Sequence, residues 1–248
     1  MNSLQLNNLK FQELKEIAID MHIKIPKKKE ELISLIKKCF EEYELYKKEK
    51  IDKYEKIEQL GNKGKEGITY LVKSSYGKYY AMKTFKKTKS SKNIKKEASL
   101  QEKASDFDIA PKVIDIDTVS KYIVMERMSS HLYDSIKKQN GNLTEKQQKQ
   151  IIKIYKGLDE AKVFHADSNI LNYMYKDKKL YIIDFGMSSE IDDKLIKKLG
   201  TNNPNVDIMT LGFILKLKEF KCPSSAYSHL IKYISSEEIK RFNLDSTT

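Results

Sequence analysis

Residues 164–186 read FHADSNILNYMYKDKKLYIIDFG, and this stretch decides the fold. It places Asp167 and Asn172 in a short polar loop, and Asp184 at the end of an apolar run. Carboxylates and amides in such positions seldom contribute to packing. These three side chains are therefore candidates for binding or catalysis.

The composition is that of a globular protein. The chain has 248 residues, 33% of them charged and 40% hydrophobic, which is enough for one large domain or two smaller ones. No apolar run approaches the roughly 20 residues that span a bilayer, and MNSLQLNNLKF has no signal-peptide core. Cys39 and Cys222 are too few and too far apart for a disulfide framework or a metal site. We therefore expect an intracellular protein, of cytoplasm or nucleus, with no membrane contact.

The net charge of +12 is concentrated in residues 51–100. Seven lysines lie from Lys83 to Lys96, and no acidic residue follows until Glu97. Such a field favours phosphate, nucleic acid or an acidic partner. A solvated lysine surface would show the same pattern, so both interpretations are open.

The N-terminal segment, residues 1–48, has helical periodicity in two stretches. Leu9, Leu14, Ile17 and Ala18 recur at helical spacing, IKIPKKK interrupts them, and an apolar pattern resumes from Leu32. We expect two helices, followed by a charged helical connector to about residue 53. The pair could form a binding module, or simply pack on the main domain.

After the connector the apolar period changes to that of β-strands. Five short runs rich in β-branched and aromatic residues predict strands, and one helical stretch, residues 90–105, interrupts them with Ser90 or Ser91 as its cap. The expected strands are KIEQL, ITYLVKS, KYYAMKTF, KVIDID and KYIVMERM. From about residue 129 the chain is mainly helical, with strands in NYMYK and LYIID. The fold class is α+β with two unequal lobes, residues 54–128 and 129–248.

The first lobe contains residues suited to phosphate binding. Gly61, Gly64 and Gly67 lie between two predicted strands, where backbone N–H groups could approach phosphates closely. Lys83 lies in an apolar strand, an unusual setting for a lysine without an anionic partner. Glu97 is the expected partner, and Glu102 is the second choice.

The sequence resembles the protein-kinase superfamily. AMK is similar to its strand-lysine motif, HADSNILN to its catalytic loop and IIDFG to its DFG motif. The resemblance implies that ATP and Mg²⁺ are used, and that Asp167 orients or accepts the substrate hydroxyl proton. It also implies that Asn172 and Asp184 bind magnesium, while Lys83, braced by Glu97, holds the α and β phosphates.

The resemblance also assigns supporting roles. His165 would pack on Phe185 of the DFG motif, beside Gly186, and Asp207 of DIMTLG would anchor the catalytic-loop backbone. Met125 would border the nucleotide pocket, and the backbone of the next three residues would contact adenine: Glu126, Arg127 and Met128. An apolar strand in a core would show the same letters as this last segment.

Several positions depart from the usual kinase pattern. Ala166 replaces an arginine that reads a phosphorylated activation loop, and Asn169 replaces a lysine that contacts the γ-phosphate. Only 22 residues separate Asp184 from Asp207, and no APE motif lies between them. The chain looks like the compact atypical kinases of RIO or KEOPS type, or like reduced kinases of large DNA viruses, which act in a host cell.

LKFQELKEIAIDMHIKIPKKKEELISLIKK, residues 9–38, resembles a SAP motif, a helical module that binds DNA in its family. Met21 and His22 stand where that family usually has glycine. The module implies contact with nucleic acid through residues 1–48, and the lysines from Lys83 to Lys96 are the other candidate surface.

Three functions are consistent with these features. The first is an atypical Ser/Thr protein kinase without activation-loop control, capable of autophosphorylation. The second is a pseudokinase scaffold brought to DNA by the SAP-like module. The third is a small-molecule phosphotransferase. Because Lys83, Asp167, Asn172 and Asp184 are all present, we expect the kinase, with a protein substrate that the sequence does not identify.

Overall fold

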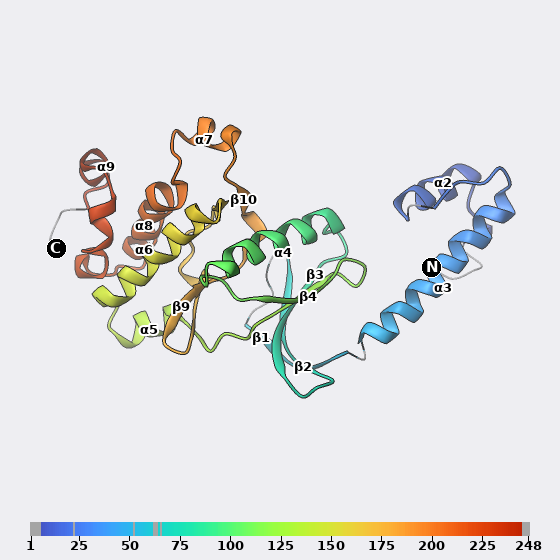
Figure 1. The fold of residues 1–248 in the computed structure, drawn as a ribbon, viewed down its shortest axis with the longest axis horizontal. Helices are drawn as coiled ribbons and strands as arrows, with labels where there is room; N and C mark the ends of the chain where they lie inside the picture. The colour runs from blue at the N-terminus through green and yellow to red at the C-terminus, as the bar shows by residue number, and fades with distance from the viewer. Residues whose placement is uncertain (1–5, 22, 52, 62–63, 65, 245–248) are drawn as a thin grey trace. The chain divides into compact units, whose positions relative to one another are not determined.

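The computed structural model describes residues 6–21, 23–51, 53–61, 64 and 66–244 (Figure 1). The chain divides into two compact units, residues 1–55 with 73–78 and residues 56–72 with 79–248. Parts of four predictions lie outside the described residues. These parts are residues 1–5 and His22 of the N-terminal module, Asp52 of the connector, Asn62, Lys63 and Lys65 of the glycine loop, and residues 245–248 of the second lobe.

The smaller unit contains the predicted helical pair. Helix α2 spans Phe11–Asp20 and α3 spans Lys29–Ile51, so α3 also covers most of the charged connector. The two helices bury a small core of their own, made of Leu6, Leu14, Ala18, Leu32 and Ile36. The expected helical hairpin is therefore present.

The first lobe, residues 54–128, is built on a five-stranded sheet. The strands are β1 (Tyr54–Leu60), β2 (Gly67–Ser74), β3 (Tyr79–Phe85), β4 (Val113–Asp117) and β5 (Tyr122–Met125), in the order β1-β2-β3-β5-β4. Strand β5 pairs antiparallel with both β3 and β4. Helix α4 (Ser91–Asp106) is capped by Ser90, whose hydroxyl accepts from the N–H of Asn93, and packs its apolar side on the sheet. The predicted sheet with one helix is confirmed.

The second lobe is mainly helical, as expected. Its helices are α5 (Leu132–Lys138), α6 (Glu145–Glu160), α7 (Asp193–Leu199), α8 (Thr210–Glu219) and α9 (Ser236–Arg241). Short 3₁₀ segments η1 (Ile170–Asn172), η2 (Phe185–Met187), η4 (Ser224–Tyr227) and η5 (Leu230–Tyr233) and a π-helical turn, η3 (Asn205–Met209), complete it. None of the helices in the described part of the chain is both long and apolar enough to cross a membrane.

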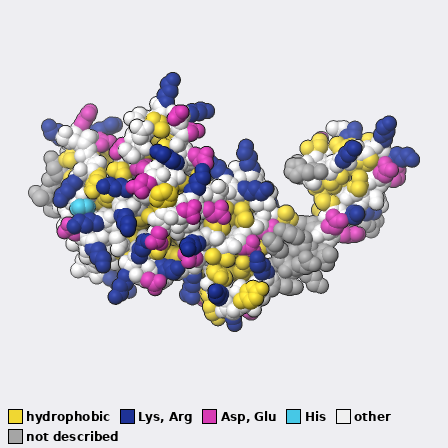
Figure 2. All heavy atoms as spheres, viewed as in Figure 1, with side chains coloured by type: hydrophobic (Ala, Val, Ile, Leu, Met, Phe, Trp, Pro, Cys, Tyr) yellow, Lys and Arg dark blue, Asp and Glu magenta, His cyan; other side chains and the backbone are white. Residues whose placement is uncertain are grey.

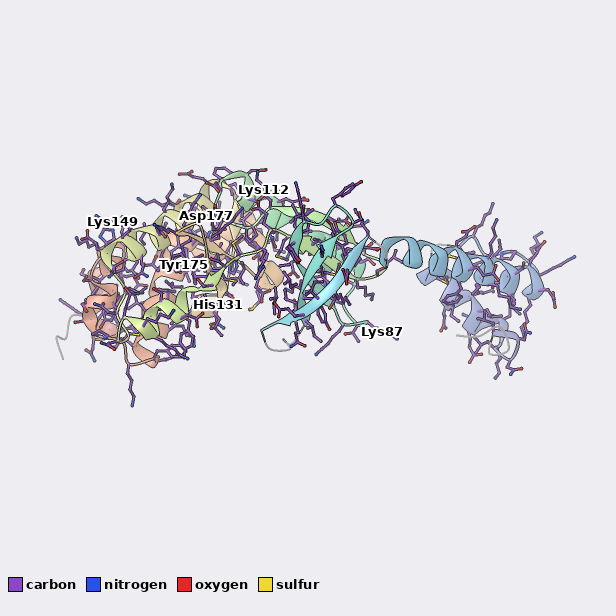
Figure 3. All side chains as sticks on the ribbon, turned by 90° about the horizontal axis from the view of Figure 1, so that it is seen from below. Lys87, Lys112, His131, Lys149, Tyr175 and Asp177 are labelled. Carbon is purple, nitrogen blue, oxygen red and sulfur yellow. The ribbon has the colours of Figure 1, made fainter. Side chains whose placement is uncertain are left out.

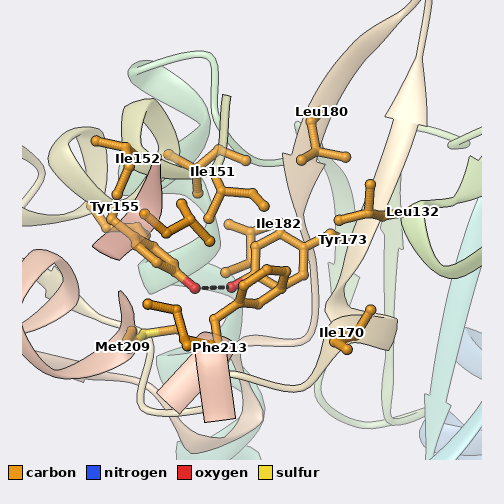
Figure 4. Packing of buried hydrophobic residues seen from close by; sticks show 14 of the residues in the cluster. Leu132, Ile151, Ile152, Tyr155, Ile170, Tyr173, Leu180, Ile182, Met209 and Phe213 are labelled. Atoms are coloured by element: carbon orange, nitrogen blue, oxygen red, sulfur yellow. Dashed lines mark hydrogen bonds between the residues drawn. The ribbon is translucent and has the colours of Figure 1, made fainter. Parts of the chain in front are cut away.

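The core of this lobe fixes the elements that carry the polar loops. Tyr155 of α6 and Tyr173 of strand β8 (Tyr173–Lys176) are fully buried, and their hydroxyls lie 2.5 Å apart (Figure 4). Burial raises the pKa of both hydroxyls, so they share this hydrogen bond as neutral groups. Phe213 of α8 packs edge-on against Tyr173. The start of β8 is thereby held against α6 and α8.

Small strands frame the polar segments. β6 (Ser130–His131), β8 (Tyr173–Lys176) and β9 (Lys179–Ile182) form one sheet, and β7 (Val163–Phe164) pairs with β10 (Ser189–Glu190). His131 and Tyr175, labelled in Figure 3, come from the paired strands β6 and β8. His131 Nδ1 also lies 3.1 Å from the carbonyl oxygen of Leu171. The loop from residue 165 to 172 is therefore fixed at both ends.

One glycine of the expected phosphate loop is required by packing. A Cβ built on Gly67 would lie 1.9 Å from the carbonyl oxygen of Thr84 on β3, whereas one on Gly64 meets only Gly67 O, at 3.5 Å. We expect Gly67→Ala to lower the free energy of unfolding by about 1–3 kcal/mol, because the strands must separate. Gly64→Ala is the control, and urea denaturation of both variants is the measurement. Equal stability of the two would mean that β2 can shift freely.

Candidate active site

The polar loop between β7 and η1 is held by His165 and its neighbours. The His165 backbone N–H donates to Asn205 Oδ1 at 3.0 Å, and its Nε2 lies 3.0 Å from the carbonyl oxygen of Ile183. The imidazole packs edge-on against Phe185, with ring centroids 4.9 Å apart, as expected. Burial lowers the pKa of His165, so the ring is neutral near pH 7. Through these contacts His165 fixes the loop against Asn205, Ile183 and Phe185.

Asp167 is oriented by two donors from its own loop. The backbone N–H of Asn169 donates to Oδ1 at 3.0 Å, and Asn172 Nδ2 donates to Oδ2 at 2.9 Å. Asn172 is itself buried, 6% exposed, while Asp167 is only partly buried. The carboxylate is thus fixed in position and still reachable from solvent.

Lys83 connects the two lobes. Its Nζ donates to Glu97 Oε1 of α4 at 2.6 Å and to Asp184 Oδ1 at 2.7 Å. Burial alone would lower the pKa of Lys83, but the charges of Glu97 and Asp184 outweigh it and raise the pKa. Lys83 is therefore cationic near neutral pH, and Glu97 rather than the exposed Glu102 is its partner.

Asn172 and Asp184 lie on hydrogen-bonded backbone segments. The N–H of Ile183, next to Asp184, donates to the carbonyl oxygen of Asn172 at 2.8 Å. Burial would raise the pKa of Asp184, yet the charge and hydrogen bond of Lys83 lower it, so this carboxylate is ionised. An amide and an ionised carboxylate are the oxygen donors that Mg²⁺ prefers. The amide nitrogen of Asn172 is directed at Asp167, which leaves its oxygen for a cation, and the donor set fits magnesium.

The segment after β5 contains the residues expected to border the nucleotide pocket. Strand β5 ends at Met125, whose Sδ lies 3.6 Å from Gln101 Nε2 of α4. The N–H of Glu126 donates to the carbonyl oxygen of Lys112 at 3.0 Å, and Met128 is buried. Contact of this segment with adenine stays a prediction.

Two charged residues that sequence reasoning did not single out also lie in the site. Glu66, between Gly64 and Gly67, places Oε1 2.7 Å from Lys89 Nζ and Oε2 3.9 Å from Lys83 Nζ. Lys89 Nζ in turn lies 3.3 Å from Glu97 Oε2. The sequence shows Lys89 only as one member of a lysine run, and Glu66 only as a loop residue, so no local signal distinguishes them.

The expected role of Asp207 requires a correction. The side chain that holds the catalytic-loop backbone is Asn205, through the bond from His165 N–H, whereas the carboxylate of Asp207 accepts from the hydroxyl of Thr201. Asn205 is fully buried and Asp207 is exposed. Both residues lie in the π-helical turn Asn205–Met209, and of the two only Asn205 faces the loop.

The geometry combines a fixed carboxylate, a lysine braced by a helix and a magnesium donor set. A family model described as the protein kinase domain matches residues 54–213, more than half of the chain. The chain belongs to the protein kinase domain family. No curated protein matches the kinase. Two residues of the site, Ala166 with φ +62° and Asp184 with φ +67°, have left-handed backbone, which is uncommon for residues other than glycine.

The lysine run from Lys83 to Lys96 does not form a single surface in the kinase. The side chains of Lys83 and Lys89 are only 14% and 11% exposed and point into the site. The other five are exposed: Lys86, Lys87, Lys92, Lys95 and Lys96. On the face of the larger unit in Figure 2, basic side chains are dispersed among acidic ones.

Proposed function

We propose that the kinase transfers the γ-phosphoryl group of ATP to serine or threonine hydroxyls of a protein. The observation that supports this most strongly is Lys83, bound at once to Glu97 and Asp184 at 2.6 and 2.7 Å. These contacts support the proposal, because phosphoryl transfer needs a cation that can bind phosphate beside a carboxylate that can bind Mg²⁺.

In the proposed reaction, the hydroxyl oxygen of the acceptor bonds to the γ-phosphorus as the bond to the β–γ bridging oxygen breaks. Asp167 orients the hydroxyl and takes its proton, and ADP leaves. Lys83 binds the α and β phosphates. Asn172 and Asp184 would hold Mg²⁺, which neutralises charge on the phosphates when it is bound.

We propose that this activity does not depend on a phosphorylated activation loop. Ala166 has no guanidinium to bind a phosphate, and Lys83, Glu97 and Asp184 are already in contact. The protein should therefore transfer phosphate as purified, to itself or to an added protein. Thr88, Ser90 and Ser91 are exposed candidates for autophosphorylation.

The test is incubation of the full chain with γ-labelled ATP and Mg²⁺, together with a generic basic and a generic acidic protein. Label on phosphoserine or phosphothreonine after acid hydrolysis supports the proposal. Label only on added small molecules would favour a small-molecule phosphotransferase. Binding of ATP with no transfer would favour a scaffold.

We further propose that the N-terminal hairpin binds duplex DNA. It has its own core, and Lys27 and Lys28 are exposed just before the start of α3. Positive charge and helix N-termini are the groups that contact DNA phosphates.

We expect Lys27→Gln/Lys28→Gln to weaken binding to duplex DNA and to reduce the slope of log K against log salt by about 1–2, because two phosphate contacts are lost. Fluorescence anisotropy at several salt concentrations measures this. The control is Lys197→Gln/Lys198→Gln, which changes two consecutive exposed lysines on α7. Equal slopes for the two variants would contradict DNA binding by the hairpin.

A further inference from the structure

Four charged side chains form a closed ring of alternating sign at the phosphate end of the site. Lys83 contacts Glu97 at 2.6 Å, Glu97 lies 3.3 Å from Lys89, Lys89 contacts Glu66 at 2.7 Å, and Glu66 lies 3.9 Å from Lys83. The aromatic ring of Phe85 lies near both lysines, with its centroid 5.3 Å from Lys83 Nζ and 5.4 Å from Lys89 Nζ. Each carboxylate is thus shared by the same two lysines.

Lys89 is turned inward from a loop that is otherwise exposed. Its three predecessors, residues 86–88, are exposed, yet the side chain of Lys89 is 11% exposed. Lys121 Nζ fixes this turn by donating to the carbonyl oxygens of Lys87 and of Lys89. A lysine loses hydration when it is buried, so the two carboxylates, and not the apolar surroundings, account for its position.

The backbone of Glu66 is fixed, but its contacts with the two lysines are made by the side chain alone. Its carbonyl oxygen accepts from the N–H of Lys86 at 2.9 Å, which ties its backbone to the end of β3. Oε2 lies against the DFG motif, because a Cβ built on Gly186 would come within 2.5 Å of it. Among the described residues, neither Glu66 Oε2 nor Glu97 Oε2 receives a hydrogen bond. A side-chain rotation would therefore release Glu66 without movement of the strand.

We propose that Lys89 is a second phosphate-binding lysine. Until a nucleoside triphosphate binds, the carboxylate of Glu66 occupies the position beside Lys89 that a phosphate would take, and the polyphosphate then displaces it. The ring and Asp184 together hold two cations and three anions, so their net negative charge opposes the binding of phosphate while Glu66 is in place. Once Glu66 rotates away, Lys83 and Lys89 both face the phosphates. Lys89 thereby supplies the cation that Asn169 does not provide from the catalytic loop. This inference rests on the proposed function, since it assumes that ATP is the phosphate donor.

The test is direct binding of three ligands to the full chain by calorimetry, with Mg²⁺ present: the β,γ-imido analogue of ATP, ADP and adenosine. Lys89→Gln should weaken binding of the triphosphate about tenfold, the effect of a lost hydrogen bond between charged groups. Lys89→Arg should restore most of the affinity, and adenosine should bind all variants equally. Lys87→Gln, at a labelled exposed lysine in the same loop, is the matched control (Figure 3).

Glu66→Gln separates phosphate binding from a structural role. Both Lys89→Gln and Glu66→Gln break the same ion pair, so a pair that only stabilised the loop would make both variants bind the triphosphate more weakly. If Glu66 competes with phosphate, Glu66→Gln should bind it several-fold more tightly than the parent chain. Opposite signs support the proposal, and equal signs or no change at Lys89 would overturn it.

The same titrations distinguish this inference from the proposed function. A parent chain that binds the triphosphate with the expected pattern, but transfers no phosphate, would contradict the kinase activity and leave the lysine pair supported. If the parent chain transfers phosphate but Lys89→Gln binds the triphosphate with unchanged affinity, the kinase activity is supported and the role of Lys89 is contradicted. Absence of triphosphate binding by the parent chain would overturn both.

Discussion

Replacement of Asp167 by asparagine is expected to lower the rate of phosphoryl transfer by about 10²–10⁴-fold, the usual contribution of a positioned base. The amide cannot accept the hydroxyl proton. In the parent chain, Asn169 N–H and Asn172 Nδ2 each donate a hydrogen bond to one oxygen of the Asp167 carboxylate. The NH₂ group of an asparagine would therefore face one of these two donors. Initial rates with γ-labelled ATP measure the effect.

The control for this variant is Asp177→Asn, the same chemical change at an exposed turn between β8 and β9 (Figure 3). Binding of ATP should persist in both variants, since Asp167 makes no contact with Lys83. Full activity of Asp167→Asn would show that positioning and charge neutralisation alone carry the reaction, as a loose transition state permits. Loss of ATP binding together with activity would indicate a misfolded loop.

Local sequence patterns predicted most of the fold. Alternating apolar residues indicated the five strands, because a half-buried sheet has a period of two. The contact between Lys83 and Glu97 was also predictable, since a lysine in an apolar strand needs a buried anion and α4 is the next element. These predictions rest on neighbours in sequence or on one dominant interaction.

The missed residues depend on contacts between distant segments. Lys89 differs from its neighbours only in its burial, which the tertiary positions of Glu66 and Glu97 decide. Asp207 was expected as the anchor because DIMTLG resembles the corresponding kinase motif, and nothing in NPNVDIMTLG indicates a π-helical turn. The left-handed backbone of Ala166 likewise has no local signal, since alanine does not favour it.

The second large effect is expected for Asn205→Asp, because Asn205 is the residue that holds the loop at His165. Asn205 donates from its backbone N–H and from Nδ2 to Asp159 Oδ1, at 3.0 and 2.7 Å, and Nδ2 also donates to the carbonyl oxygen of Val163. Aspartate at this position would still accept from His165 N–H. It would, however, direct a carboxylate oxygen at Asp159, which is 5% exposed. We expect the free energy of unfolding to fall by about 3–5 kcal/mol, the cost of an uncompensated buried charge.

This loss of stability should depend on pH. Burial already raises the pKa of Asp159 despite the hydrogen bonds from Asn205 and Val206, and a second carboxylate would raise it further. A folded-state pKa above the unfolded value means that the folded chain binds more protons, so stability falls as pH rises through the folded-state pKa. The deficit of Asn205→Asp relative to the parent chain should therefore be largest at neutral pH and shrink in acid. Urea denaturation across this pH range measures it.

Two further variants test whether the interaction between residues 159 and 205 is the cause. Asp207→Asn should cost less than about 1 kcal/mol, because it alters one exposed hydrogen bond to Thr201. Asp159→Asn should itself destabilise the chain, since its NH₂ would face donors from Asn205 or Val206. Combined with Asn205→Asp it removes the like-charge pair, so the double variant should be less destabilised than the sum of the single ones. Additive losses, or a larger effect at Asp207, would return the anchoring role to Asp207 and contradict the assignment to Asn205.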